Sequence, residues 1–457
     1  MGPRTLPHAV RTGNTVYMMM KSLSTLALSL SLFAPCLPAA AFDTGLDAFI
    51  SGLEGITVPP ATVTAVKAPA MAEWTVMVFV NGKNDLASFG KADLNEMEEA
   101  GSTSRVNVVA ELGVFKEGVK RYFVTRDEDP SRITSPVVKD LGSPDMGSWE
   151  ELADFSLWAR ENYPARRYML IVWNHGSGWV TDKPPSKGIS YDDETGNHIS
   201  TPELRKAMEK AGKIDILAMD ACLMQMMEVA YEVKDLAGLI VASEETEPGE
   251  GYPYGEMLKT IDSLAARTSE KVARGMVKDY GDFYSKTSRR ATQSAVRTAA
   301  LPGLAVLLDS WAEAALSFPA KDKLRKAGNG AAFYAIDEYK DLPDFMTKAA
   351  LESGDPVLAE RGRAIAAYIS KNVVAANYSS AAMPAGSNGL SIYVPRSPTS
   401  PRYKALRFAA DTRWDEFVDS LPRYTPPASG GCVNPGPWAS PEEQEEYFDC
   451  VMLLYRR

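Results

Sequence analysis

The 457-residue sequence is poor in the two residue types that most often supply reactive side chains, with only three histidines and four cysteines. It also lacks a dense run of Lys or Arg, and its formal net charge is −10. Such a chain has no basic surface for a nucleic acid, so no nucleic-acid partner is expected. The hydrophobic share of 45% and the charged share of 24% exclude collagen, coiled coil and bulk disorder.

Long apolar runs are equally scarce. The clearest one, at 23–37, is shorter than the roughly twenty residues that a bilayer helix needs, so no integral membrane association is expected. Lys21 precedes this run, and the small residues PAAA at 38–41 match a signal-peptidase site. The pattern predicts an exported protein, periplasmic or extracellular. Because Met18 would make a more ordinary start, the residues ahead of it indicate an over-extended gene model.

The four cysteines have different expected fates. Cleavage near Ala41 removes Cys36, whose surroundings fit a lipoprotein attachment site poorly. Cys432 and Cys450 lie close together in the tail, and in an oxidising compartment they are natural disulfide partners. Cys222 is the cysteine outside this pair. A buried structural role is the commoner fate of such a residue, so its surroundings must decide.

Composition and periodicity divide the chain into five parts. From Trp74 onward, apolar runs of strand length alternate with helical spacing, which favours a mainly parallel sheet covered by helices on both faces. Helical periods then dominate until a late strand. The predicted parts are a leader and signal peptide at 1–41, a linker or pro-segment at 42–73, an α/β core at 74–260, a helical C-terminal part at 261–424, and a Cys-containing tail at 425–457.

Several elements are specific enough to state in advance. Ser200 and Glu203 have the spacing of a capping box that opens a helix. The expected strands lie at 75–80, 106–112, 121–125, 168–173, 214–219, 239–242 and 390–394. The expected helices lie at 86–100, 149–163, 201–211, 223–233 and 304–318.

His175 and Cys222 each stand just after a predicted buried strand. Because ligands bind at the carboxyl ends of parallel strands, both residues are expected at one binding edge. A cysteine at the start of the 223–233 helix would have its thiolate stabilised by the helix dipole, and a nearby imidazole would lower its pKa further. Imidazole can also protonate a leaving amine, and the N–H groups of Gly176 and Cys222 can bind an oxyanion. These are the parts that acyl transfer needs.

Two strings carry a resemblance to a known family. Residues 171–179 read IVWNHGSGW and residues 215–222 read DILAMDAC. They resemble the clostripain family of cysteine peptidases, relatives of caspases, legumains and gingipains, and the similarity extends from about Trp74 to Leu421. The resemblance implies a caspase-like αβα sandwich with an additional helical C-terminal part, a His/Cys dyad with no obligatory third member, and cleavage after Arg or Lys. It makes His175 and Cys222 the dyad.

The resemblance also implies a specificity residue. Asp220, two positions before the cysteine, matches the family's carboxylate at the base of the pocket for a basic side chain, where a charge-assisted bond would select Arg. The alternative is a helix-capping Asp. Glu250 is a second candidate for the same pocket, with Glu244, Glu245 and Glu247 as competitors and a solvated acidic loop as the alternative.

Family members are often activated by self-cleavage in the loop after the catalytic histidine. Lys183 and Lys187 suit an enzyme that cuts after basic residues, and Lys187 is preferred because Pro184 directly follows Lys183 and obstructs cutting there.

His198 lies near the acidic residues 192–194, but one His beside flexible carboxylates usually marks a solvated loop. No transition metal and no obligatory cofactor are expected. Some family members depend on calcium, so calcium is a candidate, although no EF-hand spacing is present. The expected partners are protein or peptide substrates containing Arg or Lys, and the expected state is a monomer.

Two other functions are compatible with the same residues. One is an exported peptide-binding relative that keeps the fold but does not turn over substrate. The other is a glycosidase that uses paired carboxylates from the loops around Asp192 or Glu244, whose activity would survive alkylation of Cys222.

Overall fold

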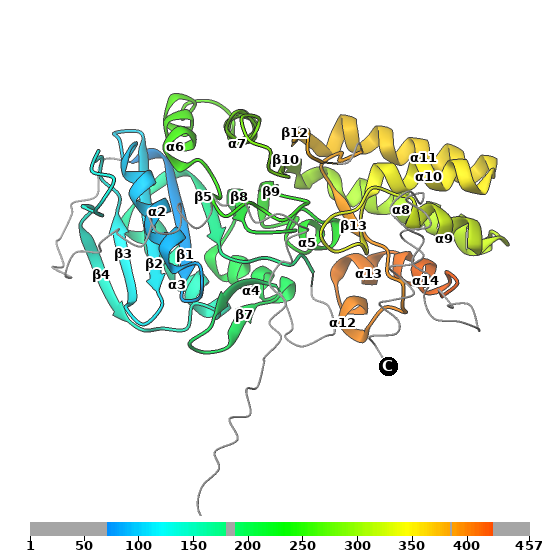
Figure 1. Cartoon of the computed structure of the whole chain (residues 1–457), viewed down its shortest axis with the longest axis horizontal. Coiled ribbons are helices and arrows are strands. Elements are labelled where there is room, and N and C mark those ends of the chain that lie inside the picture. Colours follow the sequence, from blue (N-terminus) through cyan, green and yellow to red (C-terminus); the bar gives the residue numbers. More distant parts are fainter. Residues whose placement is uncertain (1–70, 180–187, 384–385, 424–457) are drawn as a thin grey trace, which may run out of the picture. The chain divides into compact units, whose positions relative to one another are not determined.

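A nine-stranded sheet forms the centre of the computed structural model, which describes residues 71–179, 188–383 and 386–423 (Figure 1). Its strands are β1 (Ala72–Gly82), β2 (Val106–Val114), β3 (Gly118–Phe123), β4 (Val137–Gly142), β5 (Ala165–Trp173), β8 (Ile214–Asp220), β9 (Ala237–Ala242), β10 (Thr292–Arg297) and β12 (Val374–Ser379). Their order is β12-β10-β9-β8-β5-β1-β2-β3-β4. The pairs from β9 across to β2 are parallel, and the remaining strands add antiparallel at the two edges.

Helices cover both faces because the middle strands are apolar on both sides. In β1, Met77 and Phe79 belong to one hydrophobic core, whereas Val76 and Val78 belong to the other, as the two-residue period of a strand requires. The first core includes residues of α3 (Trp149–Asn162), α4 (Thr201–Ala211) and α5 (Met227–Glu232). The second includes residues of α2 (Ala87–Glu98), α6 (Tyr254–Ser263) and α7 (Ser269–Tyr284). The predicted α/β class is confirmed.

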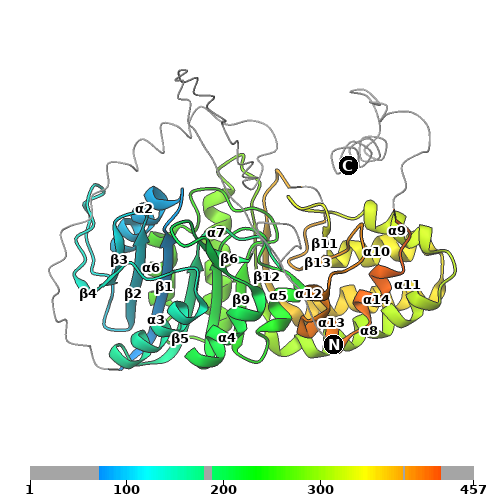
Figure 2. The ribbon, with the colours of Figure 1, turned by 90° about the horizontal axis from the view of Figure 1, so that it is seen from below.

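The later part of the chain is mainly helical, as predicted. Figures 1 and 2 show its helices gathered beside the β9–β12 end of the sheet. They are η1 (Thr298–Ala300), α8 (Leu301–Ser317), α9 (Lys321–Asn329), α10 (Leu342–Ser353), α11 (Pro356–Tyr368), η2 (Ile369–Val373), α12 (Pro401–Lys404), α13 (Arg407–Asp411) and α14 (Trp414–Asp419). Two small ladders complete the described residues: β6 (Ile189–Asp192) with β7 (Asn197–Ile199), and β11 (Tyr339–Asp341) with β13 (Ser391–Tyr393).

The sequence analysis did not predict β10, β11 or β12. β10 reads TQSAVR and β12 reads VAANYS, so neither has the continuous apolar run that identifies the middle strands. They pair at the antiparallel end of the sheet, where tertiary contacts rather than local composition select the strand. The sheet therefore draws its last two strands from the later, mainly helical part of the chain.

Among the described residues, one stretch, Thr298–Ser317, is long and apolar enough to cross a membrane by length and composition alone. In this fold Leu304, Leu308 and Trp311 are fully buried in the first hydrophobic core. Packing therefore accounts for the apolar character of this helix.

The capping box predicted for α4 is present: the Ser200 N–H donates to Glu203 Oε2 at 3.0 Å. Replacing Ser200 by Ala removes a side-chain partner of the first helical turn, and we expect it to lower the free energy of unfolding by about 1 kcal/mol. Urea denaturation followed by circular dichroism measures this change. Ser200→Thr is the matched control, since Thr also caps helices. Equal stability of Ser200→Ala and the unmodified protein would contradict the assigned cap.

Candidate active site

The parallel register of β5 and β8 brings the two candidate catalytic residues to the same edge of the sheet. Trp173 is the register partner of Asp220, at the ends of the two strands. His175 and Cys222 each follow two residues later. The sheet therefore presents both residues from adjacent turns, as the sequence predicted.

Gly176 joins these two turns by close contact. A Cβ atom at this position would lie 2.4 Å from the Cys222 carbonyl oxygen and 3.0 Å from the Cys222 nitrogen, so only glycine allows this approach. In the bridge between Gly176 and Ile189, Ser177 N donates to Gly188 O at 3.1 Å. No described residue accepts a hydrogen bond from the Gly176 N–H. The Gly176 backbone therefore lies against that of Cys222, the other residue whose N–H is predicted to bind an oxyanion.

The prediction that Cys222 begins a helix is wrong. α5 begins only at Met227, and Cys222 lies in a tight turn in which Leu223 has a φ of +65°. A hydrogen bond joins this turn to the loop after β9, because Leu223 N donates to Glu245 O at 3.1 Å. A helix dipole therefore cannot stabilise the thiolate. The Cys222 Sγ atom, in a residue only 8% exposed, instead accepts a hydrogen bond from Glu247 N at 3.3 Å.

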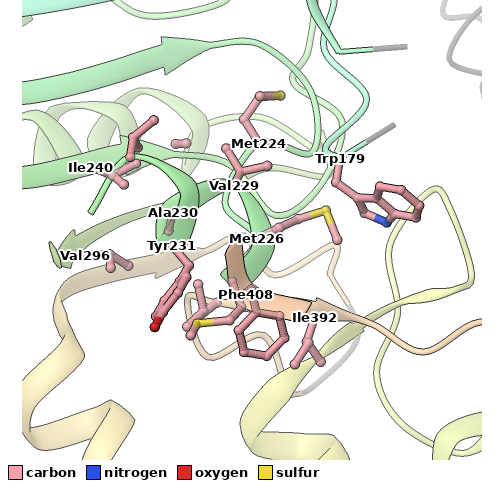
Figure 3. Close-up of a cluster of buried hydrophobic side chains, with 14 of the residues drawn as sticks. Trp179, Met224, Met226, Val229, Ala230, Tyr231, Ile240, Val296, Ile392 and Phe408 are labelled. Carbon is pink, nitrogen blue, oxygen red and sulfur yellow. The ribbon is translucent and has the colours of Figure 1, made fainter. Parts of the chain in front are cut away.

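Apolar packing fixes the chain on both sides of the two turns. Figure 3 shows Met224 and Met226, which follow Cys222, among buried side chains that include Trp179 from the histidine segment. Tyr339 of β11 donates its hydroxyl to Ser177 O at 2.8 Å and to Trp179 O at 2.9 Å. The later half of the chain therefore anchors the segment that follows His175.

His175 has a carboxylate partner that the sequence analysis missed. Its Nε2 atom lies 2.7 Å from Oδ1 of Asp85, in the turn between β1 and α2. This hydrogen bond is the largest cause of a lowered pKa for Asp85. The edge of the Tyr191 ring faces the imidazole at a centroid distance of 6.3 Å. The available signal was that Asp85 follows a buried strand, and β1 is the neighbour of β5.

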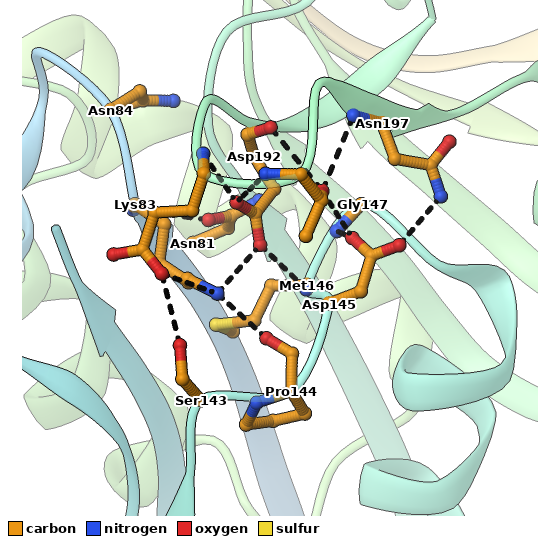
Figure 4. A network of polar contacts seen from close by, with 12 residues as sticks. Asn81, Lys83, Asn84, Ser143, Pro144, Asp145, Met146, Gly147, Asp192 and Asn197 are labelled. Atoms are coloured by element: carbon orange, nitrogen blue, oxygen red, sulfur yellow. Dashed lines mark hydrogen bonds and ion pairs between the residues drawn. The ribbon is translucent and has the colours of Figure 1, made fainter. Parts of the chain in front are cut away.

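An ionic network centred on a buried lysine holds the β6 segment against the same turn (Figure 4). The fully buried Lys83 ammonium lies 2.9 Å from Asp192 and 3.1 Å from Glu194. Asn84 donates to Tyr191 O at 2.9 Å, and Asn174 Oδ1 accepts from Tyr191 N at 2.9 Å. These contacts neutralise two of the three acidic residues at 192–194 that lie near His198 in the sequence.

Asp220 lies within the fold, only 4% exposed. Tyr254 donates its hydroxyl to Asp220 Oδ2 at 2.9 Å, and Tyr252 N donates to the same atom at 3.2 Å. Burial raises the pKa of the Asp220 carboxyl group despite these bonds. The predicted alternative, a helix cap, does not apply because no helix begins here.

Glu247 is the acidic partner of Asp220. A side-chain hydrogen bond joins the two carboxyl groups, and burial followed by the charge of Asp220 raises the pKa of Glu247. Its Oε2 atom is buried and receives no hydrogen bond from a donor group. No Lys or Arg among residues 71–179, 188–383 and 386–423 forms an ion pair with either carboxylate. The raised pKa of both carboxyl groups favours their protonated forms in the absence of a cation.

The other acidic candidates of this loop have partners elsewhere. Glu250 forms an ion pair with Arg289 at 3.1 Å, and Glu245 forms one with Arg290 at 2.5 Å. Glu244 is buried and accepts from Gly389 N at 3.0 Å. Glu247, and not the predicted Glu250, is therefore the residue of this loop that interacts with Asp220.

His198 stacks on Tyr191 with ring centroids 5.4 Å apart, and burial lowers the pKa of its imidazole. Within the described parts of the chain, no group of three or more His, Cys, Asp or Glu residues could hold a metal ion. The predicted self-cleavage residues Lys183 and Lys187 lie outside the described residues, as does the predicted disulfide between Cys432 and Cys450.

Comparisons with known proteins agree with the motifs. A model of the clostripain family matches residues 78–421. Among curated proteins, clostripain of Hathewaya histolytica is 30% identical over 138 residues, which is 27% of this chain and 26% of that protein. The chain thus spans about a quarter of the length of this curated relative.

Two solved structures share the fold. One is a secreted C11 cysteine protease from Bacteroides thetaiotaomicron in complex with an irreversible peptide inhibitor, and the other is an inactive zymogen C11 protease from Parabacteroides distasonis. Each is 21% identical, with a TM-score of 0.59, and the match covers 75% of this chain and 99% of the other. This likeness supports the arrangement of the sheet and the helices.

We expect Gly176→Ala to separate the two turns, because its methyl group would overlap the Cys222 backbone. The imidazole would then support the thiolate less well, and alkylation of Cys222 by iodoacetamide at neutral pH should slow on the order of tenfold. Gly330→Ala is the matched control, since its nearest new neighbour, Lys326 O, is at an ordinary 3.5 Å. Equal alkylation rates in the two variants would show that this contact does not position the thiol.

Proposed function

The chain belongs to the clostripain family of cysteine peptidases, as its motifs predicted, and from that premise we propose that it is an exported endopeptidase that cleaves after Arg or Lys. Cys222 is the proposed nucleophile and His175 its acid/base partner. The observation that carries this proposal is the register of β5 and β8. The two strands end side by side at Trp173 and Asp220, and His175 and Cys222 each follow two residues later.

The proposed reaction proceeds through an acyl-enzyme. His175 accepts the thiol proton as Cys222 Sγ attacks the scissile carbonyl carbon, and the N–H groups of Gly176 and Cys222 bind the oxyanion. The C–N bond then breaks as the imidazolium protonates the leaving amine. A water molecule, deprotonated by His175, attacks the thioester, and the carboxylic acid product leaves as the thiol is restored.

The two buried carboxyl groups support selection of a basic side chain. Asp220 and Glu247 are joined by a hydrogen bond and have no cation within the described residues. A guanidinium or ammonium group of the substrate would supply the missing positive charge and favour the ionised carboxylates. Glu250, already paired with Arg289, is the weaker member of the proposed pocket.

Export and self-cleavage are further parts of the proposal. Export is supported by the sequence pattern of the leader and by the relative described as secreted. Self-cleavage after Lys187 is the preferred activation step and cleavage after Lys183 the secondary one. Trp179, on the amino-terminal side of this segment, is buried, and Gly188 N, on its carboxyl side, donates to the Tyr191 hydroxyl at 2.8 Å. After cleavage between Trp179 and Gly188, both of these residues would keep their contacts with the fold.

Fluorogenic peptides ending in Arg, Lys, Asp or Ala test the activity, with Cys222→Ala and Asp220→Asn as variants. We expect cleavage after Arg and Lys only, no activity in Cys222→Ala, and a roughly 30-fold lower kcat/KM for Arg peptides in Asp220→Asn, about 2 kcal/mol of a charge-assisted bond. If no peptide is cut even after addition of calcium and activation with trypsin, the non-catalytic peptide-binding alternative takes precedence. Activity that survives in Cys222→Ala would favour a different hydrolase.

The pH dependence of KM tests the pocket separately. Burial raises the pKa of both Asp220 and Glu247, so the ionised carboxylates that attract a cation are lost first as the pH falls. We expect KM for an Arg peptide to rise toward mildly acidic pH. KM for a norleucine peptide, which has no charge, should change little over the same range. Parallel changes for the two peptides would contradict this assignment.

A further inference from the structure

The carboxylate of Asp85 has no part in the reaction proposed above, yet it is bonded to the proposed acid/base residue. Its Oδ1 atom lies 2.7 Å from His175 Nε2. We propose that Asp85 is a positioning residue, which holds the imidazole through Nε2 and thereby assigns Nδ1 to proton exchange with Cys222 and the leaving amine. This inference rests on the proposed roles of His175 and Cys222.

The turn that carries Asp85 is built firmly enough for this role. Asn84 accepts from Leu86 N at 2.9 Å and donates to Tyr191 O at 2.9 Å, so it links the turn to the β6 segment. Lys83 is fixed by its buried ion pair with Asp192. Because β1 pairs with β5, in register up to Val80 and Trp173, the turn emerges at the same edge of the sheet as His175.

Asp85 is otherwise dispensable to the fold. Its side chain is 74% exposed, whereas that of His175 is 34% exposed. The N-cap of α2 is Leu86, with no side-chain capping bond, so Asp85 is not needed to cap this helix. Its remaining structural contribution is a favourable but exposed charge near a helix N-terminus, where solvent screens the interaction. Removal of the carboxylate therefore tests its action on His175 with little effect on folding.

A second carboxylate, Asp193, distinguishes the effect of the hydrogen bond to His175 from the effect of a nearby negative charge. Asp193 follows β6, and its N–H donates to Lys83 O at 2.9 Å. Burial is the largest cause of a raised pKa for Asp193, followed by the charge of Asp85, while the charge of His175 opposes them. No hydrogen bond joins Asp193 to His175 in the described part of the chain. Asp193→Asn thus removes a neighbouring negative charge and leaves the Asp85 bond in place.

The expected effects of removing Asp85 follow from its hydrogen bond to the charged form of the His175 imidazole. A carboxylate that accepts from Nε2 stabilises the imidazolium and raises its pKa, and it also restricts rotation of the ring. The imidazolium must survive to protonate the leaving amine, so the alkaline limb of the pH–rate profile reports its pKa. Removing Asp85 should lower that pKa and move the alkaline limb to lower pH. The other titratable groups that act on this imidazole are Tyr191, at a ring-centroid distance of 6.3 Å, and Asp193, through its charge.

The kinetic test compares Asp85→Asn with Asp193→Asn. In Asp85→Asn we expect kcat to fall on the order of tenfold, part of what acid–base catalysis contributes, with KM within about twofold of its original value. The alkaline limb should move down by about 0.5 to 1 pH unit, and by clearly less in Asp193→Asn. The thermal unfolding midpoint of both variants should match that of the unmodified protein. Equal kcat losses and equal shifts in the two variants would overturn the inference.

A spectroscopic test avoids turnover altogether. The chain has only three histidines, so NMR titration can follow His175 individually in the Cys222→Ala background. Adding Asp85→Asn should lower the pKa of His175, and adding Asp193→Asn should lower it less. An unchanged His175 pKa in the Asp85→Asn protein overturns the inference even if the catalytic roles stand. If Cys222→Ala retains full peptidase activity, the proposed function fails, whereas the titration still reports the bond to Asp85.

Discussion

The pairing of β5 with β8 is the constraint on which the candidate site depends. Each residue of a strand alternates between the two faces of the sheet, so a slip of one position would exchange the two hydrophobic cores along the whole strand. Burial on both faces therefore fixes the register in which Trp173 meets Asp220. His175 and Cys222 inherit their proximity from that register. The close approach of Gly176 to the Cys222 backbone then sets the spacing of the two turns.

Two groups of charged residues beside the sheet edge differ in whether they contain a cation of their own. Lys83 neutralises Asp192 and Glu194, and every member of this group holds the β6 segment in place. Asp220 and Glu247 have no cation of their own among the described residues and share a hydrogen bond instead. A buried charge without a partner is unfavourable unless it is protonated or meets an external cation. Asp220 and Glu247 are thus suited to a basic ligand, whereas Asp192 and Glu194 already have Lys83 as their cation.

The later half of the chain contributes to the site without providing a proposed catalytic residue. Tyr339 holds the backbone after His175, and the ring of Trp179 packs against Tyr393 and Tyr403 with centroids 4.8 Å and 4.7 Å away. Gln293 of β10 donates to Glu247 at 3.4 Å. These contacts explain why the mainly helical part and the sheet share one hydrophobic core. They also make the geometry of the site depend on residues far from it in the sequence.

Local sequence determined the middle of the fold and part of the site. Continuous apolar runs identified the strands around β1, β5 and β8, and Ser200 and Glu203 identified the start of α4. Two motifs predicted His175, Cys222 and Asp220 as site residues. Only the tertiary structure revealed the turn at Cys222, the antiparallel strands β10 and β12, and the partners Asp85 and Glu247. The reason is physical: a strand buried on both faces is visible in a few consecutive residues. The contact between Asp85 and His175, 90 residues apart, exists only because the sheet brings two strand ends together.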